Sequence, residues 1–389
     1  MRTVLVTGAT GAIGSTLVPF LLREEGTAVR LLLRARSWQH LRERLEDLFK
    51  FWDLDPAAWL ASGRVEAFRG DVSRPLLGLD ESEYRRLTGD VTHIIHAAGN
   101  VRLNQPLEDA RRDAVDPAQH IVALARACRE TGRFAKLDFV STVGVAGRMS
   151  GLVPEQALNG PRPFHNTYEA AKAEAEAFLL SEMERGLPAT IHRPSMVVGD
   201  STTGKIIHFQ VFYYLSQFLS GGKTWGFVPD AGDVRLDIIP ADYVARALLI
   251  ASGRADAAGR VFHLCSGPEH ALRLADMATR LREILTGFGE RLPPLRLVRP
   301  AWFRALVPLV TPVVPATHRR ALRSLRVFLA YLDEEQTFDT RRSGLFFSAA
   351  GLQVPRVGDY LKRIMGYYWA ARDGNRLPEK GSRPGSSST

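Results

Sequence analysis

The sequence predicts an α/β protein with a Rossmann-type, doubly wound parallel sheet and a smaller, mostly helical C-terminal region. Over about the first 265 residues, apolar runs of strand length alternate with helical patterns, which is typical of parallel strands joined by crossover helices. The first run, residues 1–6, leads straight into three glycines spaced three residues apart and then into a helical pattern. The 389 residues can bury one large core or two modest ones.

The glycine-rich turn TGATGAIG, residues 7–14, carries the strongest functional signal. Glycine lets the backbone approach a bound pyrophosphate, and the N-terminus of the following helix offers free N–H groups and a positive dipole end. An ordinary strand-to-helix loop is the alternative, but the strand before the turn and the helix after it favour a dinucleotide site. The predicted cofactor-binding residues of this turn are Gly8, Thr10, Gly11, Ala12, Ile13 and Gly14.

The amino-acid composition indicates a globular protein without membrane-spanning segments. With 45% hydrophobic and 24% charged residues the chain is typical of a globular protein, and no apolar run reaches the ~18 residues of a membrane span. Met1 leads directly into the first strand, so we expect no secretory signal. Two cysteines, Cys128 and Cys265, stand among apolar neighbours and are expected to be buried free thiols in a reducing cytoplasm.

The formal net charge of +9 favours an anionic partner. The arginines are scattered, without a stripe of interleaved aromatic residues, so nucleic acid is not expected. A phosphorylated cofactor, coenzyme A, an acidic carrier protein or an anionic membrane surface fits this charge better. Alternatively, the excess of positive charge reflects the general amino-acid composition and no particular partner. The sequence predicts no metal site.

Arginines after the second strand favour NADPH over NADH. The strand 28–33 ends at Arg34, twenty residues beyond Gly14, where NAD-preferring sites usually carry an acid for the ribose 2′-hydroxyl. An arginine there would instead meet a 2′-phosphate. Arg36 follows, and Arg44 lies on a predicted helix over 38–51 that could return it to the same phosphate. Ordinary surface arginines on a basic protein are the alternative.

The next strands are expected to end in further cofactor contacts. Strand 65–68 is followed by Asp71 and Val72, and the Asp71 carboxylate could accept a hydrogen bond from the adenine amino group. Strand 91–96 ends in three small residues that would let the backbone lie against the cofactor. A helix over 117–130 leads to strand 136–140, which ends at Ser141 and Thr142. The predicted contacts are Asp71, Val72, Ala97, Ala98 and Gly99.

A helix that starts near Asn166 carries Tyr168 and Lys172, four residues apart and therefore on one face. An ammonium about 4 Å from a phenol contributes roughly 4 kcal/mol at an effective dielectric constant near 20, so Lys172 is expected to lower the Tyr168 pKa. The phenol could then exchange protons near neutral pH. This spacing also occurs by chance, but the glycine-rich turn and Thr142, 26 residues upstream, favour a catalytic set.

Strand 189–192 is followed by the segment 193–200, which is expected to leave the sheet and cover the nicotinamide end of the cofactor. Its predicted contacts are Pro194, Ser195 and Val197. The large apolar residues of 206–219 fit either core packing or the wall of an apolar pocket. Beyond them, a strand over 236–240 and a helix over 241–251 are expected, and a further strand over 261–265 is expected to rejoin the sheet.

The C-terminal part is expected to be a lid. We predict a dinucleotide-binding domain over 1–270, a substrate-binding region over 271–372 with contributions from 200–235, and a disordered tail over 373–389. A helix over 272–285 would start the lid. The segment 300–330 mixes large apolar residues with arginines, so it fits either packing on the main domain or contact with a membrane surface.

These motifs together resemble the extended short-chain dehydrogenases, and within them the fatty acyl-CoA reductases and carrier-linked thioester reductases. The resemblance covers about residues 1–265. The segments RPSMVVGDSTTG from Arg193 and LDIIPADYVA from Leu236 are similar to the acyl-thioester branch in particular. The other matching segments are TGATGAIG, LLLRARS, GDVSRPLLGL, HIIHAAGNVR, FVSTVGVAG and NTYEAAKAEAE.

The resemblance implies that Thr142 and Tyr168 bind the substrate carbonyl while Lys172 holds the nicotinamide ribose. Many family members have an asparagine relay near residue 114, where this chain reads AVDP, so water or Asp116 would have to serve. The implied reaction is NADPH-dependent reduction of an acyl thioester, presented on coenzyme A or a separate carrier protein, to an aldehyde or further to the alcohol. The alternatives are a ketone, sterol or nucleotide-sugar enzyme and a non-catalytic NADP-binding regulator.

Overall fold

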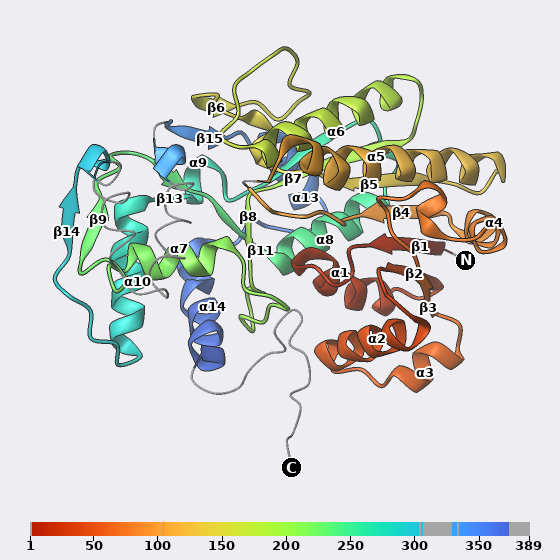
Figure 1. The fold of residues 1–389 in the computed structure, drawn as a ribbon, viewed down its shortest axis with the longest axis horizontal. Helices are drawn as coiled ribbons and strands as arrows, with labels where there is room; N and C mark the ends of the chain where they lie inside the picture. Colours follow the sequence, from red (N-terminus) through yellow and green to blue (C-terminus); the bar gives the residue numbers. More distant parts are fainter. Residues whose placement is uncertain (1, 104, 303–304, 306–328, 333, 373–389) are drawn as a thin grey trace.

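The computed structural model describes residues 2–103, 105–302, 305, 329–332 and 334–372 (Figure 1). The predicted tail and most of the segment 300–330 lie outside the described residues. Within the described residues, no helix is long and apolar enough to cross a membrane.

A seven-stranded parallel sheet forms the centre of the protein, in the order β12-β7-β5-β4-β1-β2-β3. Every residue of β2 and β5 is buried, as expected for a parallel sheet with both faces covered. The fold class predicted from the sequence is confirmed. The strands are β1 Arg2–Thr7, β2 Thr27–Leu33, β3 Val65–Arg69, β4 His93–His96, β5 Lys136–Val140, β7 Ala189–Pro194 and β12 Val261–Leu264.

Helices cover both faces of this sheet, and the alternation of side chains along β1 separates the two layers. Val4 and Val6 join a core with α1, α2 and α8, whereas Leu5 faces a core with α4, α5 and α6 (Figure 1). The helices are α1 Ala12–Arg23, α2 Trp38–Trp52, α3 Pro56–Ala61, α4 Glu81–Asp90, α5 Leu107–Glu130, α6 Thr167–Glu184 and α8 Ala241–Ser252. Short 3₁₀ helices are η1 Pro75–Gly78, η2 Val143–Ala146 and η3 Ala255–Ala257.

A second core lies beyond the carboxyl ends of the strands, around Phe212 of α7, Met277 of α10 and Ile364 of α14. Its helices are α7 Val211–Leu219, α10 Leu274–Gly287, η4 Ala330–Leu332 and α14 Val357–Arg372. The other helices of this part of the chain are α9 Gly267–His270 and α13 Arg341–Ser348. Small paired strands are β8 Met196–Val198 with β11 Ile238–Pro240, β9 Phe227–Pro229 with β14 Arg296–Val298, β10 Arg235–Leu236 with β13 Leu272–Arg273, and β6 Gly151–Val153 with β15 Gln336–Phe338.

The chain returns to the main sheet near its C-terminus. Phe346 and Phe347 of α13 pack on Phe262 of β12, and β15 pairs with β6. As a result, residues beyond 330 contribute to both cores. The predicted domain limits stay a prediction.

The structure corrects several predicted boundaries. The helix expected over 117–130 begins at Leu107, because the chain tolerates Pro117 inside α5. The strand expected over 91–96 begins at His93, since Val91 caps α4. The segment after 192 does not leave the strand at once: β7 runs to Pro194 and β8 then pairs with β11.

The strand expected over 236–240 is interrupted at Asp237, and the helix expected over 272–285 runs from Leu274 to Gly287. The interruption at Asp237 separates β10 from β11 and places its side chain at the cavity described below.

Candidate active site

A cavity of about 370 Å³ lies at the carboxyl edge of the sheet, between the main domain and the second core. This edge is where open parallel sheets bind ligands. The cavity gathers predicted residues from five separate segments, which are Gly11, Ala12, Ile13, Ala97, Ala98, Gly99, Thr142, Tyr168, Lys172, Pro194, Ser195 and Val197. The other predicted residues, Gly8, Thr10, Gly14, Arg34, Arg44, Asp71 and Val72, do not line it.

The glycine-rich turn is constrained by the protein's own backbone. A Cβ atom on Gly8, whose φ is +78°, would lie 2.6 Å from the backbone of Ala97, and one on Gly14 would lie 2.3 Å from the Gly8 carbonyl oxygen. Gly11 caps α1 without a side-chain hydrogen bond to the first turn. The glycines therefore permit close packing of the turn on β4 and leave the α1 N-terminus open to an anion.

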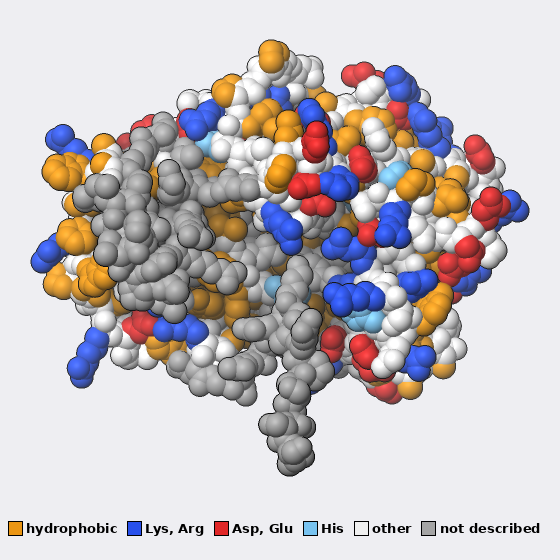
Figure 2. Space-filling model, in the orientation of Figure 1, with side chains coloured by type: hydrophobic (Ala, Val, Ile, Leu, Met, Phe, Trp, Pro, Cys, Tyr) orange, Lys and Arg blue, Asp and Glu red, His pale blue; other side chains and the backbone are white. Residues whose placement is uncertain are grey.

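Basic side chains surround the end of β2. The Arg44 guanidinium donates to Thr10 Oγ1 at 2.9 Å and also to the Arg34 carbonyl oxygen. Burial lowers the pKa of Arg44, and the neighbouring Arg34 adds to this effect. Arg34 and Arg36 are exposed. On the face of the molecule drawn in Figure 2, Lys and Arg side chains gather near the middle, above the position of α2 in Figure 1.

The loop after β3 is held by Asp71 and Val72. Asp71 Oδ1 accepts from the backbone N–H and the hydroxyl of Ser73, at 3.0 and 2.8 Å. The Val72 carbonyl oxygen is bonded to Nδ1 of His120 at 2.9 Å. Asp71 thus has one oxygen engaged locally, and its predicted adenine contact stays a prediction.

Tyr168 stands in the first turn of α6, which Asn166 caps by accepting from the Glu169 N–H at 3.0 Å. Its phenol is hydrogen-bonded to the Thr142 hydroxyl, and Thr142 in turn accepts from the Gly144 N–H at 3.1 Å. The two hydroxyl groups expected to bind a substrate carbonyl therefore lie together in the cavity.

Lys172 is buried one turn further along α6. Its ammonium donates to the Val140 carbonyl oxygen at 3.0 Å and lies 5.0 Å from the centre of the Phe139 ring. Burial lowers the pKa of Lys172 to about 8, and the nearby Glu176 carboxylate opposes this shift.

The expected lowering of the Tyr168 pKa is wrong. Burial raises it to about 12, although the Thr142 hydrogen bond opposes the rise. The sequence predicts a shift dominated by the Lys172 charge and only partly opposed by desolvation, whereas desolvation is the dominant effect in the structure.

A buried ion pair supports this site from behind. Glu176 accepts from Nε of Arg193, 3.1 Å from each carboxylate oxygen, and from the Ser141 hydroxyl at 2.6 Å. Arg193 is fully buried, and its guanidinium lies 3.2 Å from Nε2 of His263. The pair joins α6 to β5 and β7, next to the catalytic candidates.

Sequence reasoning missed residues that reach the cavity from distant segments. Asp237 lines it and accepts from the N–H groups of Ser266 and Gly267, both at 2.9 Å, while burial raises its pKa to about 6. The C-terminal segment also contributes lining residues, which are Tyr331, Leu332, Glu334, Gln336 and Phe338. The interruption of an apolar strand by Asp237 was the one local signal in the sequence.

The sequence left two interpretations of 206–219, core packing or the wall of an apolar pocket, and in the structure most of the large residues pack in the core. Phe212, Tyr213 and Phe218 belong to the second core, whereas Gln210 and Val211 line the cavity. Cys128 and Cys265 are buried free thiols, as predicted.

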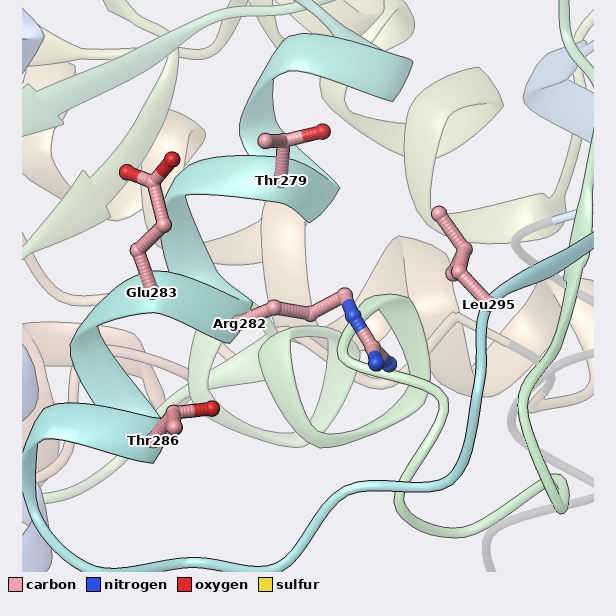
Figure 3. Close-up of a pocket in the computed structure, with 5 residues that line it drawn as sticks. All are labelled: Thr279, Arg282, Glu283, Thr286 and Leu295. Atoms are coloured by element: carbon pink, nitrogen blue, oxygen red, sulfur yellow. The ribbon is translucent and has the colours of Figure 1, made fainter.

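Asp116, the proposed substitute for the asparagine relay, does not line the cavity. A second hollow, lined by residues of α10 and by Leu295, contains none of the predicted residues (Figure 3). Its one arginine, Arg282, donates to the carbonyl oxygens of Ser220 and Pro293 at 2.6 and 2.7 Å. That side chain therefore serves to join loops.

Comparison with known proteins places the chain in a family. Residues 6–248 match the model of an NAD-binding family described as male sterility protein, and the chain belongs to this family. The expectation of an extended short-chain dehydrogenase/reductase, on the thioester reductase side of that group, is confirmed.

Relatives include the nonribosomal peptide synthetase asaC of Aspergillus flavus, 30% identical over 67% of this chain, and an isonitrile lipopeptide synthase of Streptomyces coeruleorubidus, 31% identical over 75%. The chain spans only 26% and 19% of the lengths of these two proteins. Among solved structures, the terminal R domain from the myxalamid PKS-NRPS biosynthetic pathway is 27% identical with a TM-score of 0.78, over 97% of this chain and 93% of that one.

Glu176→Gln tests the buried ion pair. The substitution leaves the Arg193 guanidinium buried without a counter-charge, so we expect the free energy of unfolding to fall by about 3–5 kcal/mol in urea titrations. Because Glu176 raises the Lys172 pKa, its loss lowers that pKa. Any dinucleotide binding that needs the charged ammonium should then be lost at a lower pH than in the wild type.

Glu174→Gln is the matched control, since Glu174 is exposed on the same helix and pairs with Arg111 at the surface. We expect no measurable change in its stability or pH profile. Equal stability of the two variants would contradict the role given to the Glu176–Arg193 pair.

Proposed function

We propose that this chain reduces an acyl thioester with NADPH, releasing a thiol and an aldehyde. The observation that carries the proposal is one cavity that holds Thr142, Tyr168 and Lys172 beside the glycine-rich turn. The family and the similar R domain support the same reaction class.

The residues present fit a dinucleotide. The open N-terminus of α1 suits the pyrophosphate, and the small residues 97–99 leave room for the cofactor at the end of β4. Ser195 adds a buried hydroxyl at the cavity wall, next to Asp237. Lys172 would hold the nicotinamide ribose, and the segment around Pro194 and Val197 would cover the nicotinamide.

The proposed chemistry follows from the protonation states of the side chains. When bound, NADPH supplies a hydride to the thioester carbonyl carbon. Thr142 and Tyr168 donate hydrogen bonds to the carbonyl oxygen and stabilise the negative charge that develops there. With a pKa of about 12, Tyr168 is protonated at neutral pH and can give its proton to that oxygen.

Collapse of the resulting thiohemiacetal breaks the carbon–sulfur bond. The oxygen returns a proton to Tyr168 as the carbonyl reforms, and the leaving thiolate takes up a proton to become the thiol. One thioester, one NADPH and one proton therefore give one aldehyde, one thiol and NADP⁺. The Lys172 ammonium, charged below a pH of about 8, adds positive potential beside the developing anion.

The donor of the acyl group is proposed to be a carrier protein or coenzyme A. The similar proteins include a nonribosomal peptide synthetase, in which the acyl group would arrive on a carrier. The net charge of +9 supports either anionic donor. The two buried free thiols support a reducing, cytoplasmic location.

NADPH is proposed over NADH because of Arg34 and Arg44. The two arginines lie at the end of β2, with the guanidinium of Arg44 bonded to Thr10 in the glycine-rich turn. A 2′-phosphate would relieve the repulsion between these like charges and accept charge-assisted hydrogen bonds.

The reaction itself is tested by following NADPH oxidation and thiol release together with a panel of acyl-CoAs and acyl carrier proteins. We expect one NADPH oxidised per thiol if the aldehyde is the product and two if the alcohol is. Tyr168→Phe should reduce kcat by about 10²–10⁴-fold, because it removes the proton donor. Tyr214→Phe, at an exposed site on α7, is the control and should retain full activity.

Turnover of a ketone, sterol or nucleotide sugar without thiol release would contradict the proposal. An unchanged cellular role of Tyr168→Phe would instead favour the non-catalytic regulator.

Cofactor choice is tested by Arg44→Ala. Loss of a hydrogen bond to a charged group costs about 1.5–3 kcal/mol, so the affinity for NADPH should fall about ten- to hundredfold while that for NADH changes little. Isothermal titration calorimetry with both dinucleotides measures the ratio of the NADPH affinity to the NADH affinity. Arg42→Ala, at an exposed site on the same helix, should leave the ratio unchanged. An NADPH preference that survives Arg44→Ala, and also Arg34→Ala, would refute this assignment.

A further inference from the structure

The C-terminal segment forms one wall of the active-site cavity, through Tyr331, Leu332, Glu334, Gln336 and Phe338. It lies almost 150 residues beyond the end of the proposed catalytic helix α6 in the sequence and continues into β15, which lies beside β6 (Figure 1). A cluster of charged and polar side chains joins this wall to the first turn of α6. The mechanism proposed above makes no use of that cluster.

His165 is at the centre of the cluster, between two carboxylates. Its Nδ1 lies 3.0 Å from Oε2 of Glu169, and its Nε2 lies 2.9 Å from Oε2 of Glu334. A carboxylate only accepts hydrogen bonds, and a neutral imidazole carries one N–H, so both contacts require the doubly protonated ring. The two carboxylates accordingly raise the pKa of His165, although burial opposes them.

Tyr331 completes the connection. Its ring stacks on that of His165 with the ring centres 4.2 Å apart, an arrangement that favours a cationic imidazole. Its hydroxyl donates to Oε1 of Glu169 and accepts from the Asn166 amide at 2.8 Å. Asn166 and Glu169 flank Tyr168, so the C-terminal wall is tied to α6 on both sides of the proposed proton donor.

The cluster also reaches the loop that carries Thr142. A Cβ atom on Gly144 would lie 3.1 Å from Cγ of Glu169 and 3.5 Å from Oγ1 of Thr142. Glu169 therefore packs directly on that loop. On the far side, Arg148 donates to Oε1 of Glu334 at 2.9 Å and balances its charge.

We propose that His165, Tyr331 and Glu334 are positioning residues that clamp the C-terminal wall onto α6, fixing the width of the acyl pocket and the orientation of Tyr168. The inference rests on the proposed thioester reductase function. A buried ionic cluster adds little net stability compared with apolar packing. Its place at the cavity wall, around the residues that flank Tyr168, gives it this role in binding the acyl group.

The clamp is expected to depend on pH. The charged and titratable groups that face His165 are Glu169 from α6, Glu334 and Tyr331 from the C-terminal segment, and Arg148 through Glu334. Its contribution is fully present below the ordinary histidine pKa near 6.5. It is lost as the pH rises through the raised pKa of folded His165, because one of the two ring hydrogen bonds then disappears.

Glu334→Gln and Tyr331→Phe test the clamp in the full-length protein, with Glu335→Gln at the exposed neighbouring position as the matched control. We expect KM for acyl thioesters to rise about tenfold, with a smaller change in kcat and unchanged NADPH affinity. In Glu334→Gln the alkaline rise in KM should move to lower pH, since His165 loses one carboxylate. Glu334→Asp keeps the carboxylate, so its KM should lie between those of the wild type and Glu334→Gln.

Hydrogen exchange provides a readout that needs no substrate. The backbone amides of residues 334–338 should exchange faster in both variants than in the wild type at the same pH, and Glu335→Gln should match the wild type. Unchanged exchange, or faster exchange with unchanged KM and pH profile, would overturn the clamp. If the wild type reduces no thioester, the proposed function fails, and the exchange rates alone then decide the clamp: unchanged rates refute it, and faster rates support it.

Discussion

The structure depends on how one helix is attached to the end of one strand. Lys172 donates to the carbonyl of Val140, Glu176 accepts from Ser141, and Tyr168 is hydrogen-bonded to Thr142. Three residues at intervals of four on α6 thus bind three consecutive residues at the end of β5. Because the end of β5 is fixed by its neighbours β4 and β7 in the sheet, the phenol and the ammonium are held at the sheet edge without relying on loop conformation.

Burial at this junction sets the protonation states that the proposed reaction needs. It raises the pKa of Tyr168 to about 12, which keeps the phenol protonated. It lowers the pKa of Lys172 to about 8, and the Glu176 carboxylate opposes this lowering and so helps the ammonium to stay charged. A protonated donor suits reduction, in which an oxyanion must be stabilised, better than oxidation, which needs a base. The same desolvation would strengthen each hydrogen bond to a developing charge.

Local signals in the sequence were sufficient for the fold and for much of the cavity. The glycine-rich turn, strand 136–140 and the spacing of Tyr168 and Lys172 each reflect short-range backbone geometry, and the structure brings these segments together at one cavity. Pro117 misled the prediction of α5, because tertiary packing outweighs the lost hydrogen bond. The Tyr168 pKa and the contribution of Tyr331 depend on burial and on contacts between distant segments, which no local pattern encodes. For Asp237 the one local signal is its interruption of an apolar strand.

The central claim is that this junction holds a nicotinamide and a thioester carbonyl together. A crystal structure of the complex with NADP⁺ tests it most directly. We predict the nicotinamide ring about 3–3.5 Å from the position that a carbonyl bound to Tyr168 and Thr142 would occupy, with the pyrophosphate at the N-terminus of α1. A nicotinamide bound away from α6, or a protein saturated with dinucleotide elsewhere, would contradict the account.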